Sequence, residues 1–196
     1  MAGIADAIGF ITMGGVFAAN MTGNTVLAGI AVAQGRYVGA VDTLATLAAF
    51  FVGAMLARLL MHLWHRRALP ILLEAAIVAA LGFLPVGVET AVLILAFAMG
   101  IQSSAIASFG GISASTVVIT STLTRTAEAS LDALVRSRND KLPSVAGPGL
   151  LALCWAGYLV GAVAGALLLH ALAWPLLVPA ILLLVVAALC GFTSAE

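Results

Sequence analysis

Long apolar stretches are the feature that most limits how this chain can fold. They run over about 2–19, 25–34, 43–64, 69–86, 90–108, 112–124, 148–171 and 173–193. Only 8% of the residues are charged, and the mean hydropathy is +1.21. A soluble domain of 196 residues cannot bury that much apolar surface. A barrel would show short alternating segments instead, so we predict an all-α integral membrane protein.

Two of these stretches, 25–34 and 112–124, are too short to cross a bilayer alone, because a crossing helix needs about 20 residues. We join each of them to the stretch before it as one discontinuous crossing. The prediction is then six crossings, three in each half, within a single membrane domain over residues 1–196. Eight spanning or re-entrant segments remain the alternative.

The two halves of the chain also match each other in order. The matching pairs are Gly14-Gly15 with Gly110-Gly111, Val52-Gly53-Ala54 with Val160-Gly161-Ala162, and His62 with His170. We therefore expect an internal repeat, with repeat 1 over about 1–88 and repeat 2 over about 89–196. Because each repeat holds an odd number of crossings, the two should be inverted relative to each other.

The loop charges predict an orientation. In the six-crossing arrangement the basic residues that share one face are Arg66, Arg67, Arg136, Arg138 and Lys141. Arg36 lies on the opposite face. Basic loop residues concentrate on the cytoplasmic side of a membrane, so we expect both termini to be cytoplasmic.

Small polar residues interrupt the apolar sequence at corresponding places in the two halves. Such residues persist in the lipid zone mainly where they line a cavity or bind something, and paired helix breaks indicate a transporter's site. The candidate substrate or ion site comprises Asp6, Asn20, Thr22, Gly23, Asn24, Thr25, Gln102, Thr120, Ser121, Thr122 and Arg125. We expect the two breaks to meet near the middle of the membrane.

Each part of this candidate site also has a purely structural interpretation. Asp6 can lie near the membrane surface, because only five residues precede it. The break over Asn20–Thr25 can be a bent helix whose polar groups are bonded within the protein. The Ser/Thr group of the second half can be a surface for helix packing, and Arg125 can belong to an exposed helix with ion pairs.

Two further features predict packing. Arg58 and Glu74 should lie at similar depth on antiparallel helices and form an ion pair. Glycines at every fourth position, Gly157, Gly161 and Gly165, allow two helices to approach closely. We expect this face to build a homodimer, although it can instead pack within one chain.

Several of these segments resemble the YoaK-like family of bacterial inner-membrane proteins. The resemblance rests on Ala2–Ala7, Gly14–Thr25, Met99–Gln102 and Ser115–Arg125. It implies a membrane protein of roughly six helices in the bacterial inner membrane, grouped with candidate small-molecule exporters. The family usually has Gly at Ser121 and Asn at Ser103, so the contribution of the second half to a site is less certain.

The leading functional hypothesis is a small-molecule transporter that works by alternating access around the two breaks. The alternative is a non-transporting membrane subunit that packs against partner proteins. No catalytic or metal-binding motif occurs in the sequence, so we expect neither an enzyme nor a cofactor. The formal net charge is zero, so we expect the lipid bilayer and a small solute as partners rather than nucleic acid.

Overall fold

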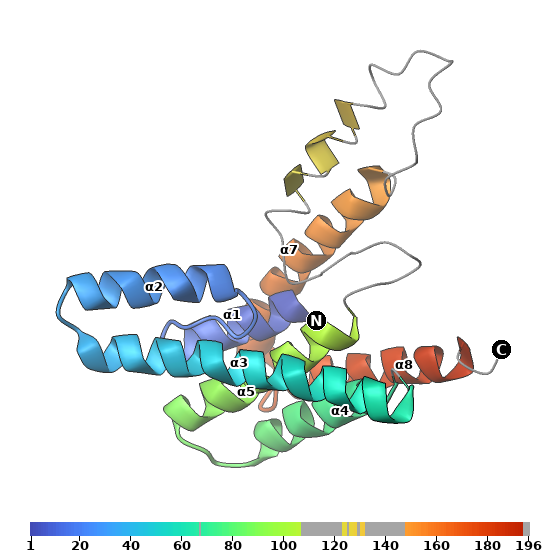
Figure 1. Cartoon of the computed structure of the whole chain (residues 1–196), viewed down its shortest axis with the longest axis horizontal. Coiled ribbons are helices and arrows are strands. Elements are labelled where there is room, and N and C mark those ends of the chain that lie inside the picture. The colour runs from blue at the N-terminus through green and yellow to red at the C-terminus, as the bar shows by residue number, and fades with distance from the viewer. Residues whose placement is uncertain (67, 107–122, 125, 129, 132–147, 194–196) are drawn as a thin grey trace.

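The computed structural model describes residues 1–66, 68–106, 123–124, 126–128, 130–131 and 148–193. Its helices are α1 (Ala2–Thr12), α2 (Met21–Ala33), α3 (Tyr37–Trp64), α4 (Ala68–Phe83), α5 (Val88–Ala105), α7 (Pro148–Ala171) and α8 (Leu177–Thr193) (Figure 1). The prediction of an all-α membrane protein is confirmed for the part of the chain that these ranges cover.

Within the described ranges, three helices are long and apolar enough to cross a membrane: α3, α5 and the Ala152–Ala171 part of α7. With 28 residues, α3 is about 42 Å long and separates Arg36 from His65 by more than a hydrocarbon core. The other apolar helices, α1, α2, α4 and α8, are shorter. Helix length therefore supports a membrane domain but leaves six crossings a prediction.

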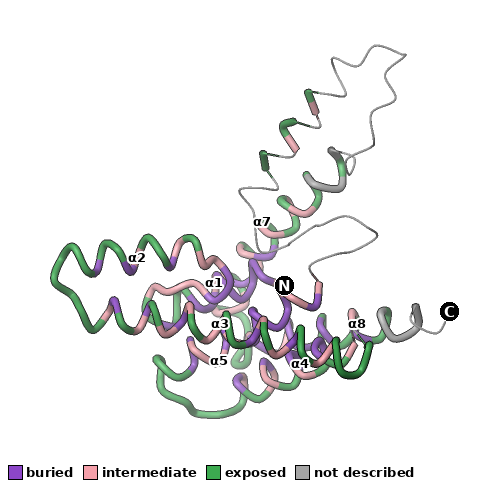
Figure 2. The backbone as a smooth tube through the Cα atoms, in the orientation of Figure 1, coloured by how far each residue is buried: buried purple, intermediate pink, exposed green. Residues whose placement is uncertain are grey.

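Burial identifies α5 as the central helix. Within the most apolar part of each long helix, 56% of the residues of α5 are buried, against 17% for α3 and 11% for α7. Figure 2 shows the outer sides of α2 and α3 as mostly exposed. Large buried side chains of the core include Ile8, Ile71, Leu95, Met99 and Leu183. They come from α1, α4, α5 and α8, which meet around this core.

Glycines set the closest helix contacts. A Cβ atom at Gly53 of α3 would collide with the carbonyl oxygen of Phe97 in α5, and one at Gly100 would collide with that of Phe50. The same happens between α1 and α7, where a Cβ at Gly3 would collide with the carbonyl oxygen of Tyr158. Only residues without side chains let two backbones come this close.

The glycine series of α7 serves packing inside the chain. A Cβ at Gly165 would lie 2.8 Å from the carbonyl oxygen of Ile4, and one at Gly161 would lie 3.5 Å from the amide nitrogen of Ile4. At Gly157 such an atom would meet nothing within 4 Å. The within-chain interpretation therefore accounts for Gly161 and Gly165, and these two glycines are not available as a dimer face.

Candidate functional site

The first helix break is a hairpin rather than a kink in one continuous crossing. Helix α1 ends at Thr12, and the next glycines, Gly14 and Gly15, have φ angles of +81° and +75°. These left-handed conformations favour glycine. The chain then turns back, and the ring of Phe17 stacks on that of Phe10 with centroids 4.7 Å apart. As a result, α2 starts beside the middle of α1 and not beyond its end.

The returning chain is hydrogen-bonded to Asp6. Its side chain is 3% exposed. Its Oδ1 accepts hydrogen bonds from the backbone N–H groups of Ala19, at 2.6 Å, and Asn20, at 3.3 Å. Its Oδ2 accepts a hydrogen bond of 2.6 Å from the hydroxyl of Tyr158 in α7. One carboxylate thus ties together α1, the N-terminal end of α2, and α7.

Two asparagines stabilise the returning segment. Asn20 caps α2, because its Oδ1 accepts from the N–H of Gly23 at 3.1 Å. Asn24 is fully buried, and its amide bonds the backbone of Phe17 twice: Oδ1 accepts from the N–H at 2.9 Å, and Nδ2 donates to the carbonyl at 2.7 Å. Asp6, Asn20 and Asn24 therefore have protein partners, although the break lies between Thr12 and Met21 and not over Asn20–Thr25, where α2 is continuous.

The remaining predicted site residues are placed differently. Thr22 and Thr25 are exposed on α2, and the Thr25 hydroxyl donates to the carbonyl of Met21 at 2.9 Å. Gln102 is 2% exposed, and its Oε1 has no hydrogen-bond partner within the part of the chain that the structure describes. The second-half group, Thr120, Ser121, Thr122 and Arg125, lies outside the described residues. The meeting of the two breaks therefore stays a prediction.

Two polar residues of the interior need a separate account. Tyr158 was not among the predicted site residues, although a tyrosine in an apolar run indicates that its hydroxyl has a buried hydrogen-bond partner. Glu74 of α4 is fully buried, and neither of its carboxyl oxygens has a hydrogen-bond partner among the described residues. Arg58 is exposed. The predicted ion pair between Arg58 and Glu74 was wrong, because the long arginine side chain turns outward from α3.

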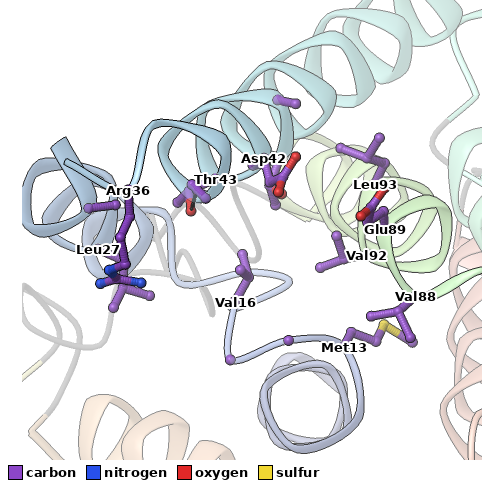
Figure 3. A pocket seen from close by; sticks show the side chains of 16 residues that line it. Met13, Val16, Leu27, Arg36, Asp42, Thr43, Val88, Glu89, Val92 and Leu93 are labelled. Carbon is purple, nitrogen blue, oxygen red and sulfur yellow. Dashed lines mark hydrogen bonds between the residues drawn. The ribbon is translucent and has the colours of Figure 1, made fainter. Parts of the chain in front are cut away.

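A cavity of about 530 Å³ lies beside the break. The residues that line it are Met13, Gly14, Gly15, Val16, Leu27, Ala31, Arg36, Gly39, Asp42, Thr43, Ala45, Thr46, Val88, Glu89, Val92 and Leu93. Figure 3 shows the carboxylates of Asp42 and Glu89 on neighbouring helices, α3 and α5. Among the described residues, no three His, Cys, Asp or Glu side chains gather in a way that could hold a metal ion. The lining of this cavity combines charged, polar and apolar side chains.

The apolar helices, the close glycine contacts and the hairpin break together define a helical membrane protein. The chain matches the family described as Protein of unknown function (DUF1275) over residues 1–189, and it belongs to that family. It is also 37% identical over 133 residues to the UPF0700 transmembrane protein YoaK of Bacillus subtilis (strain 168). The resemblance to the YoaK-like family is thus confirmed.

That match covers 62% of this chain and 59% of the length of the Bacillus protein. No solved structure matches the chain. The relatives therefore establish a family and a membrane protein, and the activity has to be inferred from the geometry.

Proposed function

We propose that the protein is a small-molecule transporter of the bacterial inner membrane that works by alternating access. The observation that carries this proposal is the position of the cavity. The hairpin residues Gly14, Gly15 and Val16 form part of its wall, together with charged side chains of α3 and α5. A break that borders a polar cavity is the arrangement by which transporters place a solute at a movable element. No catalytic step is part of the proposal.

Alternating access requires two halves that can exchange conformations, and the glycine contacts support such halves. Gly3 of α1 meets the carbonyl of Tyr158 in α7, and Gly100 of α5 meets the carbonyl of Phe50 in α3. Phe50 aligns with Tyr158 at the spacing of the Val52 and Val160 pair, and Gly3 falls one residue from Gly100 at the spacing of the Gly14 and Gly110 pair. The first helix of each half thus crosses a long helix of the other half, α7 for α1 and α3 for α5, as inverted repeats would do.

A second candidate function also has an observation in its favour. Asp6, Asn20 and Asn24 are bonded within the protein, as expected for a non-transporting subunit whose polar residues only fix the fold. The two candidates differ in what they require of the cavity. A transporter needs it open to a solute, whereas a packing subunit functions equally well when it is filled.

The deciding experiment is solute flux into proteoliposomes, screened across metabolites and drugs, with one occluding variant and one matched control. Ala45 lines the cavity, and Ala48 is an exposed residue one turn further along α3. We expect Ala45→Trp to reduce flux to the rate of empty liposomes, because the indole fills the cavity, and Ala48→Trp to leave flux unchanged. Flux that survives in the Ala45→Trp variant, or no flux of any solute in the native protein, would favour the subunit.

We also propose that the transporter is a homodimer. Six crossings make a thin bundle, which can hardly enclose a solute and also support a moving element. With Gly161 and Gly165 packed on α1, the contact should use other surfaces, such as the exposed apolar side of α3 that includes Phe51, Val52 and Met55. Native mass measurement in nanodiscs should give twice the chain mass of 19.8 kDa. A single-chain mass together with full flux would reject the dimer.

A further inference from the structure

The cavity beside the hairpin carries chemistry that specifies a class of ligand. We propose that it binds an organic cation, an amine or quaternary nitrogen on an apolar body, with Asp42 and Glu89 as the counter-charges. This inference rests on the proposed transport function for its physiological meaning, since it names the class of solute. Binding itself is independent of transport and can be measured separately.

The carboxylates of Asp42 and Glu89 take no part in the side-chain bonding of the described fold. Asp42 is partly buried and Glu89 is exposed, and neither forms a side-chain hydrogen bond or an ion pair with the described residues. Glu89 lies in the first turn of α5, where the helix dipole alone can explain an acid. Asp42 lies beyond the first turn of α3, so that explanation does not apply to it. Two negative groups without partners beside one cavity attract a positive one.

Among the described residues that line the cavity, Arg36 is the one cation, and it leaves this negative charge largely uncompensated. The guanidinium of Arg36 donates from Nε and an Nη to the Oε1 of Gln34, at 2.9 and 2.6 Å. In Figure 3 it lies near Leu27, on the α2 side, whereas Asp42 and Glu89 lie on the α3 and α5 side. The described part of the lining therefore has two carboxylates and one guanidinium, and the two signs are on different walls. An amine would favour the acidic wall.

The remaining wall determines what the amine should carry. Met13, Val16, Leu27, Val92 and Leu93 give the cavity apolar surface, and its volume of about 530 Å³ is in the range that encloses drug-sized molecules. No aromatic side chain is among the described residues that line it. Recognition of the cation therefore depends on the carboxylates and not on aromatic faces, and the apolar body of the ligand packs on the aliphatic side chains.

The test is equilibrium binding of ethidium, an aromatic organic cation, to the full chain in nanodiscs of neutral phosphatidylcholine. Empty nanodiscs supply the background. We expect Asp42→Asn and Glu89→Gln each to weaken binding by about tenfold, since each removes one charge-assisted contact. Arg36→Gln should strengthen binding, because it removes the competing positive charge. Glu128→Gln is the matched control, because it removes an exposed carboxylate that is not part of the lining, and it should change nothing.

The substitutions on the acidic wall are isosteric and break no side-chain hydrogen bond with the described residues, so circular dichroism and the melting temperature should match those of the native chain. Ala45→Trp should abolish ethidium binding, which locates the ligand in this cavity. Equal affinity in the native chain and in the Asp42→Asn/Glu89→Gln double variant would overturn the inference. So would binding that survives Ala45→Trp, or preferential binding of the anionic probe 1-anilinonaphthalene-8-sulfonate with dependence on Arg36.

The two proposals fail in different ways. Ethidium binding that depends on Asp42 and Glu89, without flux of any cation, would leave the cation site standing and count against transport. Flux of neutral or anionic solutes, without ethidium binding, would leave transport standing and reject the cation site.

Discussion

Replacing Gly53 or Gly100 by alanine should strongly destabilise the folded chain. A methyl group at either position would be forced against a backbone carbonyl oxygen of the partner helix, Phe97 for Gly53 and Phe50 for Gly100. A backbone cannot turn aside as a flexible side chain does, so α3 and α5 would have to separate. We expect each substitution to lower the free energy of unfolding by about 3 kcal/mol or more, a large share of the stability of a domain.

The control for this prediction is Gly157→Ala in α7, where the added methyl group meets nothing within 4 Å. Its higher helix propensity should leave stability unchanged or raise it by up to about 1 kcal/mol. The measurement is the midpoint of denaturant unfolding in detergent micelles, followed by circular dichroism. Similar midpoints for Gly53→Ala and Gly157→Ala would show that α3 and α5 do not cross as closely as the structure places them.

Removing the carboxylate of Asp6 should have the second-largest effect. Asp6→Leu deprives three donors of their acceptor: the N–H groups of Ala19 and Asn20, and the hydroxyl of Tyr158. Each buried donor without a partner costs about 1–3 kcal/mol, so we expect a total loss of about 3 kcal/mol or more. Asp6→Asn keeps an acceptor for the backbone amides and should lose less.

The interaction with Tyr158 can be isolated by a double-mutant cycle. Tyr158→Phe removes one hydroxyl and should cost about 1–3 kcal/mol in the native background, because it leaves Oδ2 of Asp6 without a partner. In the Asp6→Leu background it should cost almost nothing, or even stabilise the protein. Unfolding in micelles again provides the free energies. If the two losses simply add, the bond does not stabilise the native protein.

Much of the fold could be predicted from hydropathy. The stretches 43–64, 69–86 and 90–108 coincide, within a few residues, with α3, α4 and α5. The stretch 2–19 does not coincide with one helix, because it holds α1 and the returning chain. The returning residues are as apolar as a helix, so hydropathy cannot separate them. Two consecutive glycines with positive φ determine the turn. The sequence shows the two glycines, but it does not show that their φ angles are positive and reverse the chain.

The site was predictable in its chemistry and not in its partners. Asp6, Asn20 and Asn24 were identifiable because polar groups inside apolar sequence must bind something. That their partners are the protein's own backbone depends on the hairpin, and Tyr158 is 152 residues away from Asp6. Asp42 and Glu89 were not predicted as site residues, because in the sequence each resembles an ordinary charged residue near the start of a helix. Only the tertiary structure places them beside one cavity.

The hydrogen bond between Tyr158 and Asp6 joins α7 to the first break, and the positions that align with them in the other half are Phe50 and either Gln102 or Ser103. Under the proposed cycle, the two halves exchange conformations, so only residues that differ between them can make the two end states unequal in energy. A difference of about 1.4 kcal/mol from this one bond would populate one end state tenfold over the other. Most of the empty protein would then be in the end state that is open to one particular side of the membrane. Solute from that side of the membrane would bind readily, and solute from the other side would bind seldom. The hydroxyl of Tyr158 alone would therefore determine from which side the cycle usually begins.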